Sequence, residues 1–136
     1  MTLPFFLKCM APIFILVGMT HLVLGSSAEV LLGAVLKVGD PVLDSQDRFY
    51  GTSFMLYGAV LILSASDMKR FAPLLTCFIW CLFAAGLARL VSIAVVGLPS
   101  PAVVFLLLTE LALPLILVVW RLSLNKTPPE QSSSLL

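Results

Sequence analysis

The sequence predicts an all-α integral membrane protein: a four-transmembrane-helix up-down bundle with a short interfacial helix in its first outer loop. Of the 136 residues, 60% are hydrophobic and only 11% are charged, whereas a soluble domain carries about 25% charged residues. The hydrophobic residues fall in four runs, each close to the ~20 residues that cross a bilayer. A chain of this length is expected to form one membrane domain, over residues 1–124.

The first run predicts a span over about residues 3–24 that is retained, because no basic segment or cleavage site marks it as a signal peptide. Lys8 lies one turn inside this span, from which it can reach the near interface. Pro12 is expected to kink the helix because proline has no N–H to donate. His21 lies roughly one turn from the far end.

The next segment is the one long connection, and its pattern predicts a short helix over about residues 27–37. This run is too short to span, so we expect it to lie at the interface or to dip in as a lid. Gly39 is expected to end it. Ser45 is a suitable N-cap for the second span, and Asp47 in the first turn would face the positive end of the helix dipole.

The second span is predicted over about residues 48–65. Gly51 and Gly58 lie seven residues apart on one face, so a neighbouring helix can approach closely there. Tyr57 lies nine residues after Arg48, which places it ~13 Å below the interface at ~1.5 Å per residue. A phenol at that depth needs a hydrogen-bond partner.

Two further spans, over about residues 71–96 and 101–122, flank a Gly-Leu-Pro-Ser-Pro turn. Residues 125–136 are polar and predict a disordered cytoplasmic tail. Lysine and arginine are concentrated on one side of the predicted bundle, at Lys8, Lys69, Arg70, Arg121 and Lys126. The positive-inside rule then places both termini in the cytoplasm.

Arg89 and Glu110 are two charges within apolar runs, on either side of that turn. Both lie roughly 12–15 Å from the turn at ~1.5 Å per residue, and so at matching depth. A charge there costs several kcal/mol unless it is paired or hydrated, and an antiparallel hairpin would bring these two together. Pro114 cannot bond the carbonyl of Glu110, which predicts a kink beside the carboxylate.

Several polar residues are predicted to lie in the same outer half of the bundle, and these are the candidate ligand-binding residues: His21, Arg48, Tyr57, Arg89, Ser92 and Glu110. Each also has a structural interpretation. Arg89 and Glu110 can be an ion pair that fixes helix register; a buried pair is weak evidence for stability, so specificity or function must then explain it. His21 can be a hydrogen-bonded helix-end residue, and Arg48 a cation at the rim.

Cysteine and charge patterns exclude other kinds of site. Cys9, Cys77 and Cys81 all lie in apolar runs and are expected to be ordinary buried thiols, although Cys77 and Cys81 share a helix face and could meet. The chain has no CxxC and no Cys/His cluster at metal spacing, so no metal site is predicted. It has no basic arm, so we expect no nucleic-acid partner.

Four segments carry a resemblance to a known family: GMTHLVLG, DRFYGTSFMLYGAVLI, GLARLVSIAVVGLPSP and the glutamate at Glu110. Over roughly residues 10–120 the chain resembles the DUF4345 family of small four-span membrane proteins, which belongs with the DoxX-like group. The resemblance implies a four-helix bundle in a bacterial inner membrane and carries over no established reaction. Relatives in the wider group resemble quinone-linked redox subunits, but this chain has no cofactor motif that supports the transfer.

Three functions follow as hypotheses. The first is a binding or accessory protein whose outward polar pocket holds a lipid-like or quinone-like molecule, or a partner membrane subunit. The second is a membrane enzyme acting on a hydrophobic substrate, with His21 or Glu110 as acid or base; no nucleophile paired with a base supports it. The third is a small proton-coupled transporter, which Arg89 disfavours because it would hold Glu110 ionised.

Overall fold

The structure is a computed structural model that describes residues 2–31, 33–35 and 39–125, and in these residues it contains helices and no strand. The helices are α1 (Leu3–Leu24), α2 (Ser27–Leu31), α3 (Pro41–Ser66), α4 (Ala72–Val96) and α5 (Pro101–Asn125). Four of them, α1, α3, α4 and α5, are long and apolar enough to cross a membrane. The predicted fold class is confirmed, and the chain is a multi-pass membrane protein.

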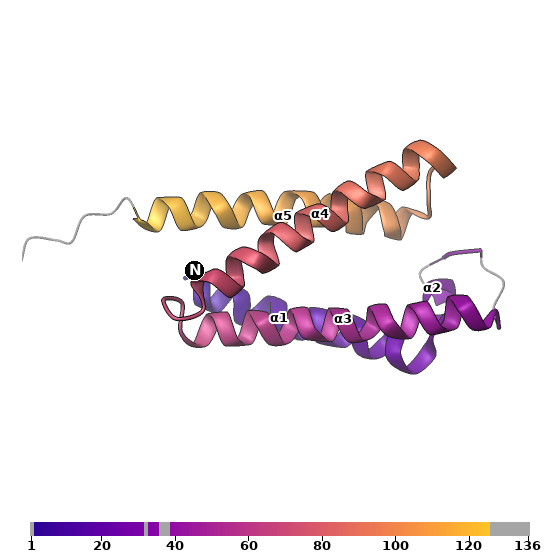
Figure 1. The fold of residues 1–136 in the computed structure, drawn as a ribbon, viewed down its shortest axis with the longest axis horizontal. Helices are drawn as coiled ribbons and strands as arrows, with labels where there is room; N and C mark the ends of the chain where they lie inside the picture. The colour runs from indigo at the N-terminus through magenta and orange to yellow at the C-terminus, as the bar shows by residue number, and fades with distance from the viewer. Residues whose placement is uncertain (1, 32, 36–38, 126–136) are drawn as a thin grey trace, which may run out of the picture.

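Helices α1 and α3 pack side by side along their length (Figure 1) because glycines remove the side chains between them. A Cβ atom added at Gly18 would lie 2.5 Å from the carbonyl oxygen of Gly51, and one at Gly58 would lie 2.8 Å from that of Ala11. At these points backbone meets backbone. The predicted close approach on the Gly51–Gly58 face is confirmed, and its partner is α1.

All four long helices meet at one end of the molecule, which we call the packed end and which holds the start of α1 and the α3–α4 turn (Figure 1). Its core consists of buried apolar side chains from each of the four long helices: Leu3, Leu7, Ala11, Leu61, Ala65, Leu75, Phe78, Ile79, Leu82 and Leu117. Burying such side chains against one another excludes voids and lipid alike.

At the opposite end, the open end, α4 has diverged from the α1–α3 pair, whereas α5 runs roughly parallel to that pair (Figure 1). This end holds α2 and the α4–α5 turn. Within α4, no residue after Gly86 is buried. Most of the exposed side chains in this part of α4 are apolar, for example Val91 at 64% and Val95 at 78% exposure, as expected for a surface that faces lipid.

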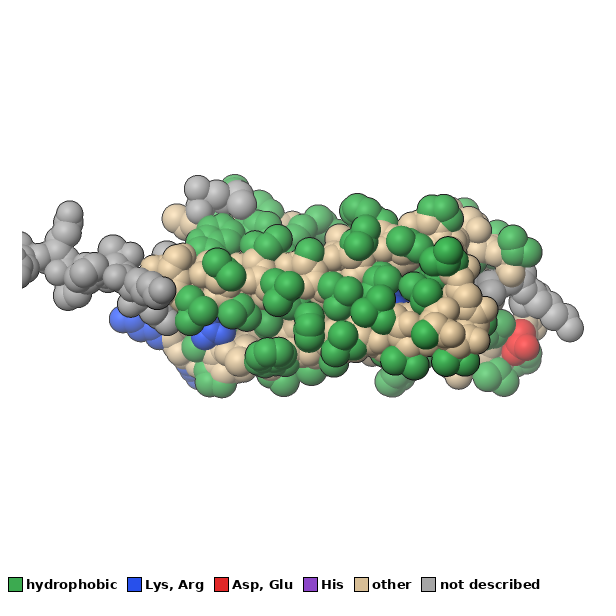
Figure 2. Space-filling view, turned by 90° about the horizontal axis from the view of Figure 1, so that it is seen from above, with side chains coloured by type: hydrophobic (Ala, Val, Ile, Leu, Met, Phe, Trp, Pro, Cys, Tyr) green, Lys and Arg blue, Asp and Glu red, His purple; other side chains and the backbone are tan. Residues whose placement is uncertain are grey.

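The surface has the charge distribution of a membrane protein. Figure 2 shows a face dominated by hydrophobic side chains, with lysine and arginine gathered near one end and acidic groups at the other. The apolar band between these ends is the part that contacts the hydrocarbon of a bilayer.

Helix α3 begins at Pro41, seven residues before the predicted start at Arg48. The Asp40 side chain caps it by accepting hydrogen bonds from the backbone N–H groups of Val42 and Leu43, at 2.8 and 3.3 Å. Proline at the first helical position needs no N–H partner, so an Asp-Pro start is favourable. The prediction of Ser45 as the N-cap is therefore wrong, and Asp47 lies beyond the first turn.

Other predicted boundaries change less. Helix α2 ends at Leu31, short of the predicted 37, although residues 32 and 36–38 lie outside the described part. Helix α5 continues to Asn125, three residues past the predicted 122. The predicted tail, beyond Asn125, lies outside the described residues.

The cysteines were expected to be buried, and this is wrong: Cys9, Cys77 and Cys81 are all exposed on the protein surface. They lie on helix faces that point away from the bundle, where an apolar thiol meets lipid as readily as protein. The predicted proximity of Cys77 and Cys81 is confirmed, with 4.0 Å between their Sγ atoms.

Candidate functional site

Arg89 of α4 and Glu110 of α5 form an ion pair, as predicted. The Nε–H of Arg89 donates to Oε2 of Glu110 at 2.7 Å, and the side chains are 33% and 6% exposed. Gly86, one turn before Arg89, lets the two helices approach: a Cβ atom there would lie 3.3 Å from the Cβ of Glu110. The α4–α5 turn and this glycine together place the two charges at the same depth.

Because Glu110 is buried, its carboxylate would destabilise the protein if Arg89 did not pair with it. A carboxylate within hydrocarbon loses its hydration, so its guanidinium partner supplies the compensating charge and hydrogen bond. Pro114 is fully buried one turn further along α5. Because proline has no N–H, the carbonyl of Glu110 also lacks its usual helical donor.

A pocket of about 440 Å³ lies between α1 and α5, and Glu110 is one of its lining residues. We call it the α1–α5 pocket. Helix α1 contributes Met10, Ile13, Phe14 and Val17, α5 contributes Phe105, Leu106, Thr109, Glu110, Ala112, Leu113 and Ile116, and Phe54 and Leu82 come from α3 and α4. Its volume is in the range of small-molecule sites, ~300–1,000 Å³.

The polarity of this pocket differs from the sequence-based expectation. Thr109 and Glu110 are polar, and every other lining residue is apolar. The Thr109 hydroxyl donates to the carbonyl of Leu106 at 2.7 Å. The predicted polar pocket is therefore an apolar cavity with one small polar area on α5.

His21 does not line this pocket and lies at the open end of α1, where it is buried. Its Nδ1 lies 3.0 Å from the carbonyl oxygen of Val17, and its Nε2 lies 3.4 Å from Oε1 of Glu29. These contacts join the end of α1 to α2. They match the interpretation of His21 as a hydrogen-bonded helix-end residue.

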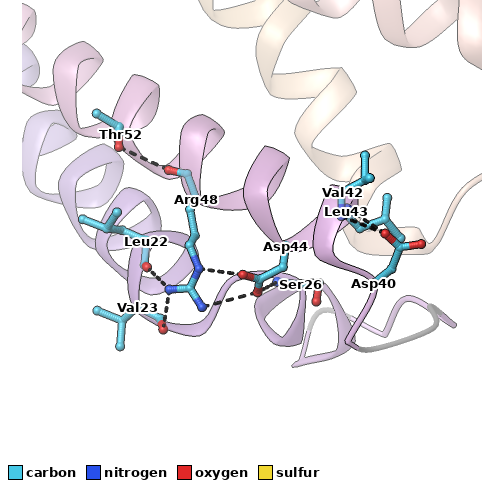
Figure 3. A network of polar contacts seen from close by, with 9 residues as sticks. All are labelled: Leu22, Val23, Ser26, Asp40, Val42, Leu43, Asp44, Arg48 and Thr52. Carbon is cyan, nitrogen blue, oxygen red and sulfur yellow. Dashed lines mark hydrogen bonds and ion pairs between the residues drawn. The ribbon is translucent and has the colours of Figure 1, made fainter.

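Arg48 clamps the end of α1 (Figure 3). One terminal nitrogen donates to the carbonyls of Leu22 and Val23 at 2.7 and 3.2 Å, while Nε donates to Asp44 at 2.8 Å. Asp44 also accepts from the backbone N–H of Ser26 at 3.3 Å. Arg48 thus satisfies carbonyls that have no partner at a helix C-terminus, and it does not line the α1–α5 pocket.

Tyr57 lies in an aromatic cluster with Phe14, Phe54 and Phe78, whose ring centroids are 6.3, 5.9 and 5.6 Å from its own. Within the described residues, no hydrogen bond joins its hydroxyl to the Arg89–Glu110 pair. Ser92 is exposed on α4 and also lies outside the pocket. The six predicted candidates thus divide among separate places, and only Arg89 and Glu110 come together.

Sequence reasoning missed most of the pocket lining. Met10, Phe14 and Val17 follow helical spacing along α1, but a lipid-facing stripe has the same pattern and composition. Thr109 offered a signal, since it precedes Glu110 in an otherwise apolar run. Among the described residues there is no group of three or more His, Cys, Asp or Glu side chains that could hold a metal ion.

A comparison with protein families gives one finding: the family model described as "Domain of unknown function (DUF4345)" matches residues 2–121 of this chain. This range covers α1, α2, α3 and α4 and most of α5, including the pocket and the ion pair. Searches of curated proteins and of solved structures found no match.

Proposed function

We propose that this chain, which belongs to the DUF4345 family, is a binding or accessory protein of the membrane that holds a lipid-like or quinone-like molecule in the α1–α5 pocket. The observation that carries the proposal is an apolar cavity of about 440 Å³ with the buried carboxylate of Glu110 in its wall. Such a cavity offers apolar burial for most of a ligand and one polar area to orient it.

The pocket is reached from the lipid phase. Three of its lining residues are largely exposed on the apolar surface: Ile13 at 51%, Phe105 at 66% and Ile116 at 55%. Their exposure places the mouth of the pocket on the band that faces the bilayer. A ligand that dissolves in the membrane can therefore enter sideways, between α1 and α5.

The ion pair supports a role beyond stability. A buried pair contributes little net free energy compared with apolar residues of similar volume, and α4 and α5 already pack closely at Gly86. A charge pair beside a cavity has a further use, because its fixed charges orient the polar group of a bound molecule.

The test compares two tryptophan substitutions on α1 in the full-length protein. Ile13→Trp places a large side chain in the pocket, whereas Leu16→Trp adds the same bulk at a residue that is 69% exposed and outside the lining. Native mass spectrometry and lipid extraction of purified protein are expected to find a bound molecule in the wild type and Leu16→Trp, and to find it lost in Ile13→Trp.

The same experiment distinguishes the other occupants. Equal content in all three proteins would contradict the proposal. A specific membrane protein that co-purifies with the wild type and is lost in Ile13→Trp would assign the pocket to a helix of a partner subunit.

We also propose that the chain lies in a bacterial inner membrane with both termini in the cytoplasm. Lys8, Lys69, Arg70 and Arg121 are all at the packed end, and Asp40 and Asp44 are at the open end. This asymmetry follows the positive-inside rule. Fusions of green fluorescent protein and alkaline phosphatase to the C-terminus test it: fluorescence without phosphatase activity is expected, and the reverse result would contradict the orientation.

A further inference from the structure

We infer that the α1–α5 pocket selects uncharged apolar molecules that donate a hydrogen bond, such as long-chain alcohols, over molecules of the same shape that only accept one. The inference rests on the proposed function and narrows it: of the lipid-like and quinone-like molecules proposed for this pocket, it favours those with a free hydroxyl, such as a quinol, over a quinone, whose oxygens only accept. It follows from the hydrogen-bonding capacity of the few polar groups in the pocket wall.

Glu110 is one of the lining residues of the pocket, and we take its carboxylate as an acceptor in the wall. As the carboxylate of an ion pair it donates no hydrogen bond and offers about four lone-pair sites. The Nε–H of Arg89 occupies one of these at 2.7 Å. Arg89 itself is not among the lining residues, so its donors are not presented to the pocket.

Thr109 is a second acceptor, because its single O–H is already committed. The hydroxyl donates to the carbonyl of Leu106 at 2.7 Å, which leaves only the lone pairs of its oxygen. The remaining lining side chains are apolar. The backbone N–H groups of this part of α5 are used within the helix. The polar side chains of the pocket wall can therefore accept hydrogen bonds from a ligand, and none of them has a free donor.

Three classes of ligand are disfavoured by such a wall. An anion would bring its own charge into hydrocarbon beside a pair that is already neutral, and the lining offers it no donor. A ligand with only carbonyl or ether oxygens would place acceptor against acceptor and leave its own polar atoms unsatisfied. A cation would bring an uncompensated charge into hydrocarbon, because Arg89 already neutralises Glu110. An uncharged hydroxyl compound satisfies the wall without these costs.

The experiment measures binding of dodecanol and of dodecyl methyl ether to the full-length wild type in lipid nanodiscs. The ether keeps the chain and the oxygen and replaces the donated hydrogen with a methyl group. Dodecanol is expected to bind about tenfold more tightly, which corresponds to about 1.4 kcal/mol. Equal binding, or tighter binding of the ether, overturns the inference.

The Ile13→Trp variant separates this inference from the proposed function. Equal binding of both probes that is lost in Ile13→Trp would overturn the donor selectivity and leave the pocket as a binding site. Failure of both probes to bind the wild type would count against the pocket and the selectivity together. A tenfold preference lost in Ile13→Trp and kept in Leu16→Trp supports both.

Glu110→Gln tests the origin of the preference. The amide donates as well as accepts, so the preference for dodecanol is expected to fall towards equal binding. A preference that stays at the wild-type ratio would overturn the role of Glu110. If this variant fails to accumulate because Arg89 is left unpaired, the double variant Arg89→Met with Glu110→Gln gives the same comparison without an isolated guanidinium.

Discussion

The packed end and the open end of this protein are built from the same four long helices but differ in how many of them meet. At the packed end, buried side chains from α1, α3, α4 and α5 form one core. At the open end, α4 has diverged from α1–α3 (Figure 1). The open end contains the ion pair, the buried histidine and the Arg48 clamp.

The α1–α5 pocket borders the core and shares residues with it. Leu75 and Leu117 of the core do not line the pocket, whereas Leu82 belongs to both. Met10, Phe14 and Leu113 of the lining also pack against the core. From this border the pocket extends along α5 to Phe105, near the start of that helix.

The largest expected effect comes from breaking the α1–α3 pair. Gly58→Leu places a side chain where even a Cβ atom would lie 2.5 Å from Ile15 and 2.8 Å from the Ala11 carbonyl, so the helices must separate and little folded protein should accumulate. The matched control is Ala59→Leu, at the adjacent exposed position, which should accumulate normally. Membrane-fraction immunoblots measure both, and normal accumulation of Gly58→Leu would contradict the packing described.

Removing one member of the ion pair should have the next largest effect. Arg89→Ala leaves Glu110 buried without its partner, and breaking a buried pair costs about 3–5 kcal/mol; the exposure of Arg89, at 33%, makes the lower value the expected one. The double variant Arg89→Met with Glu110→Met removes both charges and should approach wild-type stability. Unfolding in detergent measures this. Equal loss in the single and double variants would show that an unpaired Glu110 carries no cost, which would contradict this account.

Truncations along α4 sharpen the comparison of the two ends. Leu75→Ala at the packed end removes a fully buried side chain and should cost about 2–5 kcal/mol. Leu87→Ala, at a residue that is 45% exposed in the open half of the same helix, should change stability by less than about 0.5 kcal/mol. Thermal melting in one detergent measures both. Similar losses would mean that the core extends further than the structure shows.

The smallest effect is expected at the exposed clamp. Arg48→Met removes the donor to the carbonyls of Leu22 and Val23, so the end of α1 should fray while the core is unchanged. Hydrogen–deuterium exchange should increase in residues 22–26 and stay at the wild-type rate in α4. Unchanged exchange at the end of α1 would show that the clamp is redundant.

The membrane spans were predictable from the sequence because the length and hydrophobicity of each run depend only on neighbouring residues. Four apolar runs of membrane length predicted four spans, and three of the predicted starts lie within one residue of the observed ones. The start of α3 was missed because Ser45 was taken as the N-cap, although Asp40 and Pro41 also form a favourable helix start. A short segment that can form either a turn or a helix start takes the conformation that the rest of the fold favours.

The candidate site was predictable in one part. Arg89 and Glu110 are joined by a short turn, so hairpin geometry alone brings them to the same depth. His21 and Arg48 were expected near them because they lie in the same half of the bundle. Each instead has a nearer partner, Glu29 or Asp44, since a polar group in an apolar phase binds the first partner it can reach.

By itself, the amino-acid sequence determined the membrane location, the helices and the pairing of Arg89 with Glu110, because length, hydrophobicity and a short turn act within neighbouring residues. Only the tertiary structure decided that α1 packs on α3 through glycine, that α4 diverges from this pair, and that a pocket forms between α1 and α5. The reason is physical. Side chains that face lipid, core or cavity in a membrane are equally apolar, so only the packing of distant helices distinguishes them.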